Sequence, residues 1–144
     1  MSEIIVAYWS GTGNTQMMAK SIVKGIQDAG KEAKALPMEA VSASELKDCP
    51  VFALGCPAMG AEELEEGTVE PFVTEVEGFA TGKKIALFGS YDWGDGEWMR
   101  TWQERMENAG ARIIDREGLI CHGTPDTEGE AECEALGKAI AQEA

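Results

Sequence analysis

Three short runs of apolar residues, each followed at once by a turn-rich stretch, constrain the fold of this chain more than any other feature. The runs cover Ile4–Trp9, Val51–Cys56 and Ile85–Phe88. Continuous apolar runs of this length are typical of parallel strands that are buried on both faces of a sheet. Two weaker runs, Lys34–Met38 and Arg112–Ile120, are interrupted by proline or by polar residues, so we expect them at the sheet edges.

Apolar residues spaced three or four apart lie between these runs and predict amphipathic helices that pack on the sheet. They are Met18, Ile22 and Ile26; Phe72, Val73 and Val76; Trp98, Trp102 and Met106; and Leu136 and Ile140. Trp98 and Trp102 are expected in the core. Two capping boxes, Ser42 with Glu45 and Thr127 with Glu130, predict the starts of a short second helix and of the last helix.

Strands that alternate with helices through right-handed crossovers predict an α/β fold, a doubly wound three-layer sandwich. The most apolar strands belong at the centre and the weaker ones at the edges, so the simplest order of a five-stranded parallel sheet is 2-1-3-4-5. Residues 1–144 are expected to form a single domain, because no linker, repeat or low-complexity segment interrupts the pattern.

The charge and the cysteine pattern exclude several classes of function. The chain has 26 acidic and 12 basic residues and a net charge of −14, which disfavours nucleic acid and anionic membranes and favours solubility or basic protein partners. The four cysteines form no Cys-x-x-Cys pair and His122 is the only histidine, so we expect no metal site. We also expect a cytoplasmic protein, because neither a signal peptide nor a membrane-spanning apolar run is visible.

The loop after the first strand combines glycines with neutral hydrogen-bond donors and contains no lysine or arginine. It fails the Walker pattern because Asn14 follows Gly13, and it fails the dinucleotide fingerprint because Gln16 stands where a small residue is needed. Backbone amides at a helix start, helped by hydroxyl and amide side chains, suffice to hold one terminal phosphate. The alternative is a helix-capping turn without a ligand. The candidate phosphate residues are Ser10, Gly11, Thr12, Gly13, Asn14 and Thr15.

Three loops together carry a resemblance to a known family. The sequences "SGTGNT", "GCPAMGAEELEEG" and "FGSYDWGDGEWM" follow the first, third and fourth predicted strands and are similar to the loops of flavodoxins of the short-chain type. The resemblance spans the whole chain and implies a non-covalently bound flavin mononucleotide (FMN). Its phosphate would lie in Ser10–Thr15, and its isoalloxazine ring would lie between the other two loops. The residues implied in those loops are Pro57, Ala58, Met59, Gly60 and Glu62, and Ser90, Tyr91, Asp92, Trp93 and Gly94.

The resemblance also implies particular roles for several of these side chains. Met59 and Trp93 would flank the flat ring. Trp9 would contact the ribityl chain, although burial beneath the loop is the alternative. Glu62 would accept a hydrogen bond from the pyrimidine edge, the alternative being a solvated acid. The peptide at Gly60 would turn its carbonyl to the flavin on one-electron reduction and so stabilise the neutral semiquinone.

One departure from the family concerns Asp92, since a glycine is common at this position in related sequences. It leaves the conformation of the third loop open.

The acidic surroundings suggest a function for such a flavin. Between Pro57 and Glu77 there are seven glutamates and no lysine or arginine. Negative charge opposes added electrons, so we expect a low-potential one-electron carrier that cycles through semiquinone and hydroquinone states. We expect it to be a monomer and to bind briefly to basic faces of reductases and acceptors. We expect an electron-transfer protein without catalytic residues, and not an enzyme.

Other functions on the same topology remain to be compared. An FMN-dependent quinone reductase or a redox activator is the alternative, although the three loops contain no histidine or lysine that would act in catalysis. A phosphoryl-receiver module is disfavoured, because the first and third strands do not end in aspartates.

Overall fold

The computed structural model describes residues 3–144, in which strands and helices alternate along the chain. The strands are β1 (Ile4–Tyr8), β2 (Ala33–Pro37), β3 (Val51–Gly55), β4 (Lys84–Tyr91), β5 (Arg112–Ile113) and β6 (Leu119–His122). The α-helices are α1 (Asn14–Asp28), α2 (Val69–Glu77), α3 (Glu97–Asn108) and α4 (Thr127–Glu143). Two short 3₁₀ helices, η1 (Met38–Ala40) and η2 (Ala43–Asp48), connect β2 to β3. Within residues 3–144, no helix is both long enough and apolar enough to cross a membrane.

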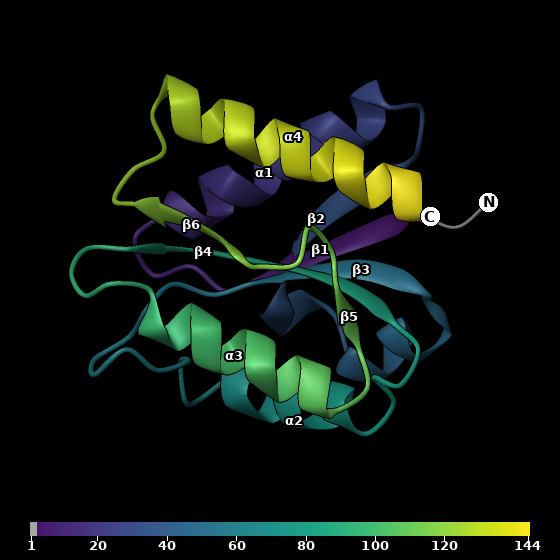
Figure 1. The fold of residues 1–144 in the computed structure, drawn as a ribbon, viewed down its shortest axis with the longest axis horizontal. Helices are drawn as coiled ribbons and strands as arrows, with labels where there is room; N and C mark the ends of the chain where they lie inside the picture. The colour runs from purple at the N-terminus through teal and green to yellow at the C-terminus, as the bar shows by residue number, and fades with distance from the viewer. Residues whose placement is uncertain (1–2) are drawn as a thin grey trace.

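The strands form one parallel sheet in the order β2-β1-β3-β4-β5, which confirms the predicted order (Figure 1). The central strand β3 is buried along its whole length, whereas in β2 at the edge only the first residue, Ala33, is buried. Pairing Val6 with Ala53 and Ala53 with Ala86 places the carboxyl ends of β1, β3 and β4 at one edge of the sheet. This alignment determines where the three loops of interest lie.

The last strand differs from the prediction of one strand over Arg112–Ile120. The chain pairs with β4 at β5, leaves the sheet, and pairs with β4 again at β6. Asp115 and Arg116, in the detour between them, have positive φ angles of 64° and 71°, a conformation that interrupts extended backbone. The interruption therefore coincides with the polar residues that weakened the strand pattern.

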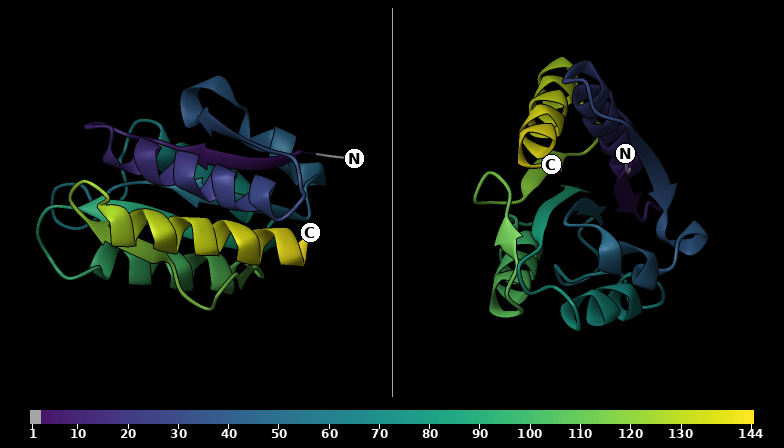
Figure 2. Two further views of the ribbon diagram at one scale, coloured as in Figure 1. Left: turned by 90° about the horizontal axis from the view of Figure 1, so that it is seen from above. Right: turned by 90° about the vertical axis from the view of Figure 1, so that its right-hand side faces the viewer.

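The helices cover the two faces of the sheet as two pairs, giving three layers. Helices α1 and α4 lie side by side on one face, and α2 and α3 cover the other (Figure 2). Each face has its own core: Met18 and Ile140 belong to one apolar cluster, and Phe72 and Trp102 belong to the other. Trp98 and Trp102 are each only 1% exposed, which confirms their expected place in the core.

Helices α1 and α4 approach each other closely because glycines lie at their contact. A Cβ added to Gly25 would lie 2.0 Å from the carbonyl oxygen of Glu134, and one added to Gly137 would lie 2.1 Å from that of Ile22. Neither position tolerates a side chain without movement of the backbone. The two glycines thus fix the distance between the helices.

The helix starts confirm one predicted capping box and correct the other. The Ser42 backbone N–H donates to the Glu45 carboxylate at 2.8 Å, although the short helix that follows is a 3₁₀ helix. For the last helix the predicted Thr127–Glu130 box is wrong. Asp126 is the cap, and its carboxylate accepts the Gly129 N–H at 2.8 Å. An aspartate is a strong helix cap and takes precedence over the threonine beside it.

Candidate functional site at the carboxyl ends of the strands

A pocket of about 180 Å³ lies at the carboxyl ends of β1, β3 and β4. It collects residues from all three loops that the sequence singled out. The lining residues are Trp9, Gly11, Thr12 and Asn14, then Pro57, Ala58 and Met59, and then Ser90, Tyr91 and Asp92. Segments that are far apart in the sequence therefore meet at the expected edge of the sheet, where doubly wound folds bind their ligands.

The loop before α1 leads into a first helical turn whose amides have no side-chain cap among the described residues. Gly13, at the helix N-cap, has a φ of 97° and open space where a Cβ would stand. The Ser10 hydroxyl folds back and accepts the Gly13 N–H at 3.0 Å. No acidic residue lies in the first turn of α1, and within residues 3–144 no side chain bonds to the amides of that turn. The positive end of the helix dipole is thus left for an external anion.

The first and third loops are joined by a buried pair of hydroxyl groups. The Thr15 Oγ1 and Ser90 Oγ atoms lie 2.9 Å apart, and the two residues are 1% and 3% exposed. A hydroxyl donates one hydrogen bond and accepts up to two, so the pair uses only one of the two available protons. The other proton has no acceptor among the described residues.

The second loop turns sharply after Met59. Met59 and Glu63 exchange two backbone hydrogen bonds, of 2.9 and 3.0 Å, and so close a tight turn. Two residues within the turn, Gly60 and Glu62, have positive φ angles of 44° and 56°. A glycine adopts this conformation at little cost, whereas for a glutamate it is uncommon. The turn thus exposes the Gly60 peptide to solvent.

The Glu62 carboxylate links the second loop to the third. Its Oε1 accepts the backbone N–H groups of Gly96 and Glu97 at 3.1 and 3.0 Å, at the start of α3. Among the described residues, no hydrogen bond involves its Oε2. Glu62 is therefore neither a free solvated acid nor fully occupied, because one oxygen caps a helix and the other is available.

The third loop holds an exposed tryptophan, Trp93, and is followed by a buried one, Trp98. Trp93 is 63% exposed, whereas Trp98 is buried and donates its indole N–H to the carbonyl of Cys56 at 3.1 Å. Tyr91 lies between the loop and this core, with its ring centroid 5.7 Å from that of Trp98. Trp93 thus leaves a large flat side chain in solvent next to Asp92, which lines the pocket.

Two ionisable groups next to the pocket have structural roles. Burial alone would raise the pKa of Glu65, but N–H donors from Val69, Thr68 and Gly67 lower that pKa below its ordinary value. The carboxylate thereby holds the start of α2. Burial raises the pKa of the Cys56 thiol to about 12, so this thiol stays protonated.

Three carboxylates near the third loop lie close enough together to be considered as metal ligands. Oxygens of Glu62, Asp95 and Glu97 lie within 4.8 Å of one another. Glu62 already binds two backbone amides, and Asp95 pairs with Arg100 at 3.1 Å. Protein contacts therefore engage two of the three carboxylates.

One segment near the pocket was not expected from the sequence. Residues 122–124 comprise the last residue of β6 and the two residues after it, and they contact both the first and the third loop through His122 and Thr124. From the sequence alone, the only role considered for His122 is that of a metal ligand. The place of His122 beside the third loop depends on which strand β6 pairs with, so the signal lies in the sheet topology.

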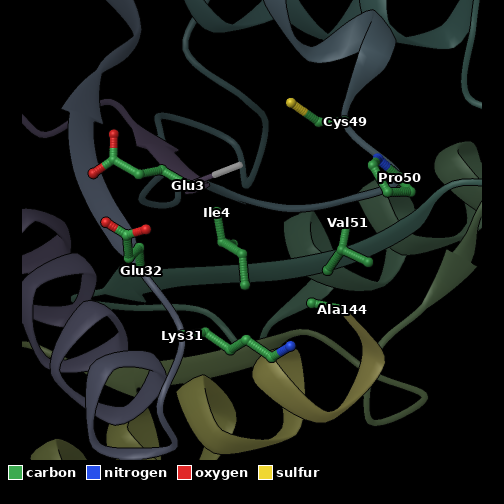
Figure 3. A pocket seen from close by; sticks show the side chains of 8 residues that line it. All are labelled: Glu3, Ile4, Lys31, Glu32, Cys49, Pro50, Val51 and Ala144. Carbon is green, nitrogen blue, oxygen red and sulfur yellow. The ribbon is translucent and has the colours of Figure 1, made fainter. Parts of the chain in front are cut away.

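A second pocket, of about 220 Å³, lies at the opposite edge of the sheet (Figure 3). Its walls come from the amino ends of β1 and β3, from the turn after α1, and from the end of α4. Ile4, Pro50 and Val51 make much of the lining apolar, and no helix start faces it. It lacks the convergent donors of the first pocket and lies at the edge opposite the one where doubly wound folds bind ligands.

Comparisons with known proteins agree with this geometry. The flavodoxin family model matches residues 6–136. Flavodoxin from Clostridium beijerinckii is 47% identical over 136 residues, which cover 94% of this chain and 97% of that protein. Flavodoxin from Megasphaera elsdenii is 44% identical over 137 residues, which cover 95% and 97% of the two chains.

Solved structures give the same result for the fold. The solution structure of two-electron reduced Megasphaera elsdenii flavodoxin superposes with a TM-score of 0.86 at 43% identity, over 96% of this chain and 98% of that one. A flavodoxin from the domain Archaea superposes with a TM-score of 0.87 at 28% identity. The matches extend over almost the whole of each chain, and the chain belongs to the flavodoxin family.

Proposed function

We propose that this flavodoxin carries single electrons between redox proteins with an FMN held by residues 10–15, 57–62 and 90–94. The observation that carries this proposal is the convergence of all three loops on one pocket at the carboxyl ends of β1, β3 and β4. Bound FMN supplies redox chemistry in one-electron steps. The chain's own residues hold, orient and shield it.

The phosphate fits the start of α1 without any cationic side chain. The uncapped amides of the first turn and the dipole of α1 favour a dianion, and the open space at Gly13 lets it approach the backbone. Thr12 and Asn14 line the pocket and add side-chain donors. The free proton of the Thr15–Ser90 pair adds another.

The ring fits between the second and third loops. Met59 lines the pocket on one side, and the exposed Trp93 lies in the loop on the other. A thioether and an indole both pack favourably on a flat polarisable ring. Trp9 lines the pocket near the phosphate loop, which suits contact with the ribityl chain.

Glu62 is suited to hold the polar edge of the ring while it caps α3. Its Oε1 is engaged by Gly96 and Glu97, and its Oε2 is left to accept a ring N–H. The same carboxylate would then fix the spacing of the two loops that flank the ring. Its charge opposes electron addition, as do those of the exposed Glu63 and Glu66 nearby.

The partners follow from the same charges. A chain with a net charge of −14 and acids grouped beside the pocket attracts basic surfaces and repels other acidic ones. We therefore propose brief contacts with reductases and acceptors that present basic faces. Four free cysteines suit a reducing compartment such as the cytoplasm.

The proposal is tested by an anaerobic reductive titration of the purified protein reconstituted with FMN. We expect one FMN for each chain and two resolved one-electron steps in the absorption spectrum. An assay for quinone reduction by a nicotinamide cofactor, without added reductase, should show no steady turnover. A protein that stays colourless in excess FMN, or that sustains quinone turnover, would contradict the proposed role.

A further inference from the structure

The turn between β6 and α4 lies beside the proposed flavin site although it belongs to none of the three loops. Strand β6 pairs with the carboxyl end of β4, so that His122 is the partner of Tyr91. The Gly123 N–H donates to the Tyr91 carbonyl at 2.7 Å and extends the pairing by one residue. Residues 122–124 are thereby held against the start of the third loop.

His122 contacts the backbone of the third loop through its ring. The Nε2 atom lies 2.9 Å from the carbonyl oxygen of Asp92. A carbonyl only accepts hydrogen bonds, so Nε2 must carry the proton and donate it. The imidazole also lies against Tyr91, with ring centroids 5.1 Å apart at an interplanar angle of 45°. These two contacts fix the peptide that joins Asp92 to Trp93.

Thr124 contacts the phosphate loop from the same turn. Its hydroxyl donates to Oδ1 of Asn14 at 3.0 Å. Asn14 is the first residue of α1 and lines the pocket. Since the amide oxygen is engaged by a donor, the Asn14 NH₂ group keeps both of its protons for another acceptor. The orientation of this amide is thus set in favour of an anion.

We propose that residues 122–124 form a fourth part of the FMN site, in which His122 and Thr124 are positioning residues. His122 holds the loop that carries Trp93 and so acts on the ring. Thr124 orients the Asn14 amide and so acts on the phosphate. This inference rests on the proposed FMN site, and it assigns the two residues to opposite ends of the same ligand.

Riboflavin, which lacks the phosphate, separates the two roles. The dissociation constants of FMN and riboflavin are measured by the quenching of flavin fluorescence on titration with apoprotein. For His122→Ala we expect both constants to rise about tenfold, the effect of one hydrogen bond and a ring contact. For Thr124→Val we expect the FMN constant to rise about fivefold and the riboflavin constant to stay within twofold.

Two further variants serve as controls. His122→Gln retains a side-chain N–H at a similar reach and should restore both constants to within about threefold of the original. Thr127→Val removes a hydroxyl three residues after Thr124, at an exposed position in α4 for which no side-chain hydrogen bond is found among the described residues. It should leave both constants unchanged.

Several results would overturn the inference. They are unchanged binding in His122→Ala, no rescue by His122→Gln, or equal losses of FMN and riboflavin in Thr124→Val. If the unaltered apoprotein bound neither flavin, the proposed FMN site itself would fail, which is a distinct outcome.

A measurement on the unaltered apoprotein does not depend on how the variants fold. Because His122 is the only histidine, the ¹⁵N spectrum of the imidazole reports it without ambiguity. At a pH where the ring is neutral we expect the tautomer protonated at Nε2. The Nδ1-protonated tautomer would contradict the hydrogen bond to Asp92.

Discussion

At the scale of single residues, the site contains both side chains that are buried in the fold and side chains that are exposed and available to a ligand. Trp98 is buried and its N–H is bonded to the Cys56 carbonyl, whereas Trp93 is 63% exposed in the same part of the chain. Exposure of an indole costs solvation free energy unless something covers it. Trp93 is therefore the residue whose loss should affect binding without affecting the fold.

Replacing Trp93 by alanine should weaken FMN binding and leave the apoprotein as stable as before. The loss of one aromatic stacking contact is worth about 1–3 kcal/mol, or roughly fivefold to 150-fold in the dissociation constant. Fluorescence titration measures the binding, and thermal unfolding of the apoprotein measures the stability. Trp93→Phe keeps a flat face and should retain most of the affinity. Equal affinities for the alanine variant and the original protein would refute the stacking role.

At the scale of secondary-structure elements, helix contacts and helix starts determine how firmly the loops are supported. Gly25 and Gly137 let α1 and α4 touch at the level of their backbones, and the phosphate loop is continuous with α1. Glu65 binds three N–H groups at the start of α2, immediately after the turn that holds Met59. The glycine contact between α1 and α4 and the Glu65 helix cap can each be tested by substitution.

Replacing Gly137 by alanine should destabilise the fold, although alanine is the better helix former. In a helix without neighbours the change would stabilise by up to about 1 kcal/mol. Here the added methyl group would lie 2.1 Å from the Ile22 carbonyl oxygen, and such overpacking costs about 1–3 kcal/mol or more. Urea unfolding measures the difference, with Lys138→Ala on the exposed side of α4 as the control. A Gly137→Ala variant more stable than the original would disprove the close contact.

Glu65 should make the stability of α2 depend on pH. The pKa of its carboxyl is lowered in the folded protein from an ordinary value of 4.5, since hydrogen bonds to backbone N–H groups outweigh the effect of burial. The stabilisation is therefore complete above about pH 4.5 and is lost as the pH falls through the lowered pKa. Relative to Glu65→Gln, we expect an advantage of about 1 kcal/mol at neutral pH that vanishes in acid.

Urea unfolding between pH 2 and pH 7 follows this difference. Glu66→Gln, at the exposed neighbouring position, should show no such pH dependence. An advantage for Glu65 that persisted undiminished down to pH 2 would contradict the assignment of the helix cap to its carboxylate.

At the scale of the whole molecule, we expect the arrangement of charge to influence the flavin potential and the encounter with partners. Glu63 and Glu66 are exposed and lie in the segment next to the pocket, without the helix-capping bonds that engage Glu62 and Glu65. A unit charge about 10 Å away through water opposes an added electron by roughly 0.4 kcal/mol, or about 20 mV. Charges at the far edge of the sheet should have much smaller effects because salt screens them.

The double variant Glu63→Gln/Glu66→Gln should therefore raise the lower of the two one-electron potentials by about 40 mV at low salt. Spectroelectrochemical titration measures this shift, which should shrink as ionic strength increases. Glu32→Gln/Glu107→Gln removes the same charge from exposed positions near the amino ends of β2 and β5, and should shift the potential less because the interaction weakens with distance. Equal shifts in the two double variants would rule out a local field.

The same scale shows what could be predicted from the sequence and why. Buried strands such as β3 have an unambiguous pattern, so the sheet order and the meeting of the three loops follow from hydrophobicity and topology. The interruption after Ile113 depends on two backbone angles at Asp115 and Arg116 that no periodicity encodes. The role of His122 depends on the pairing of β6 with β4, which only the folded chain reveals.

The detour between β5 and β6 has a practical consequence for attaching this protein to something else. Asp115 and Arg116 are exposed and lie outside the sheet, while Ile114 before them is only 1% exposed and Gly118 after them packs against Met99. Both sides of the detour are thus anchored. A flexible linker inserted between Asp115 and Arg116 could attach this protein to an electrode or a fused reductase. Neither terminus would then be used for the attachment.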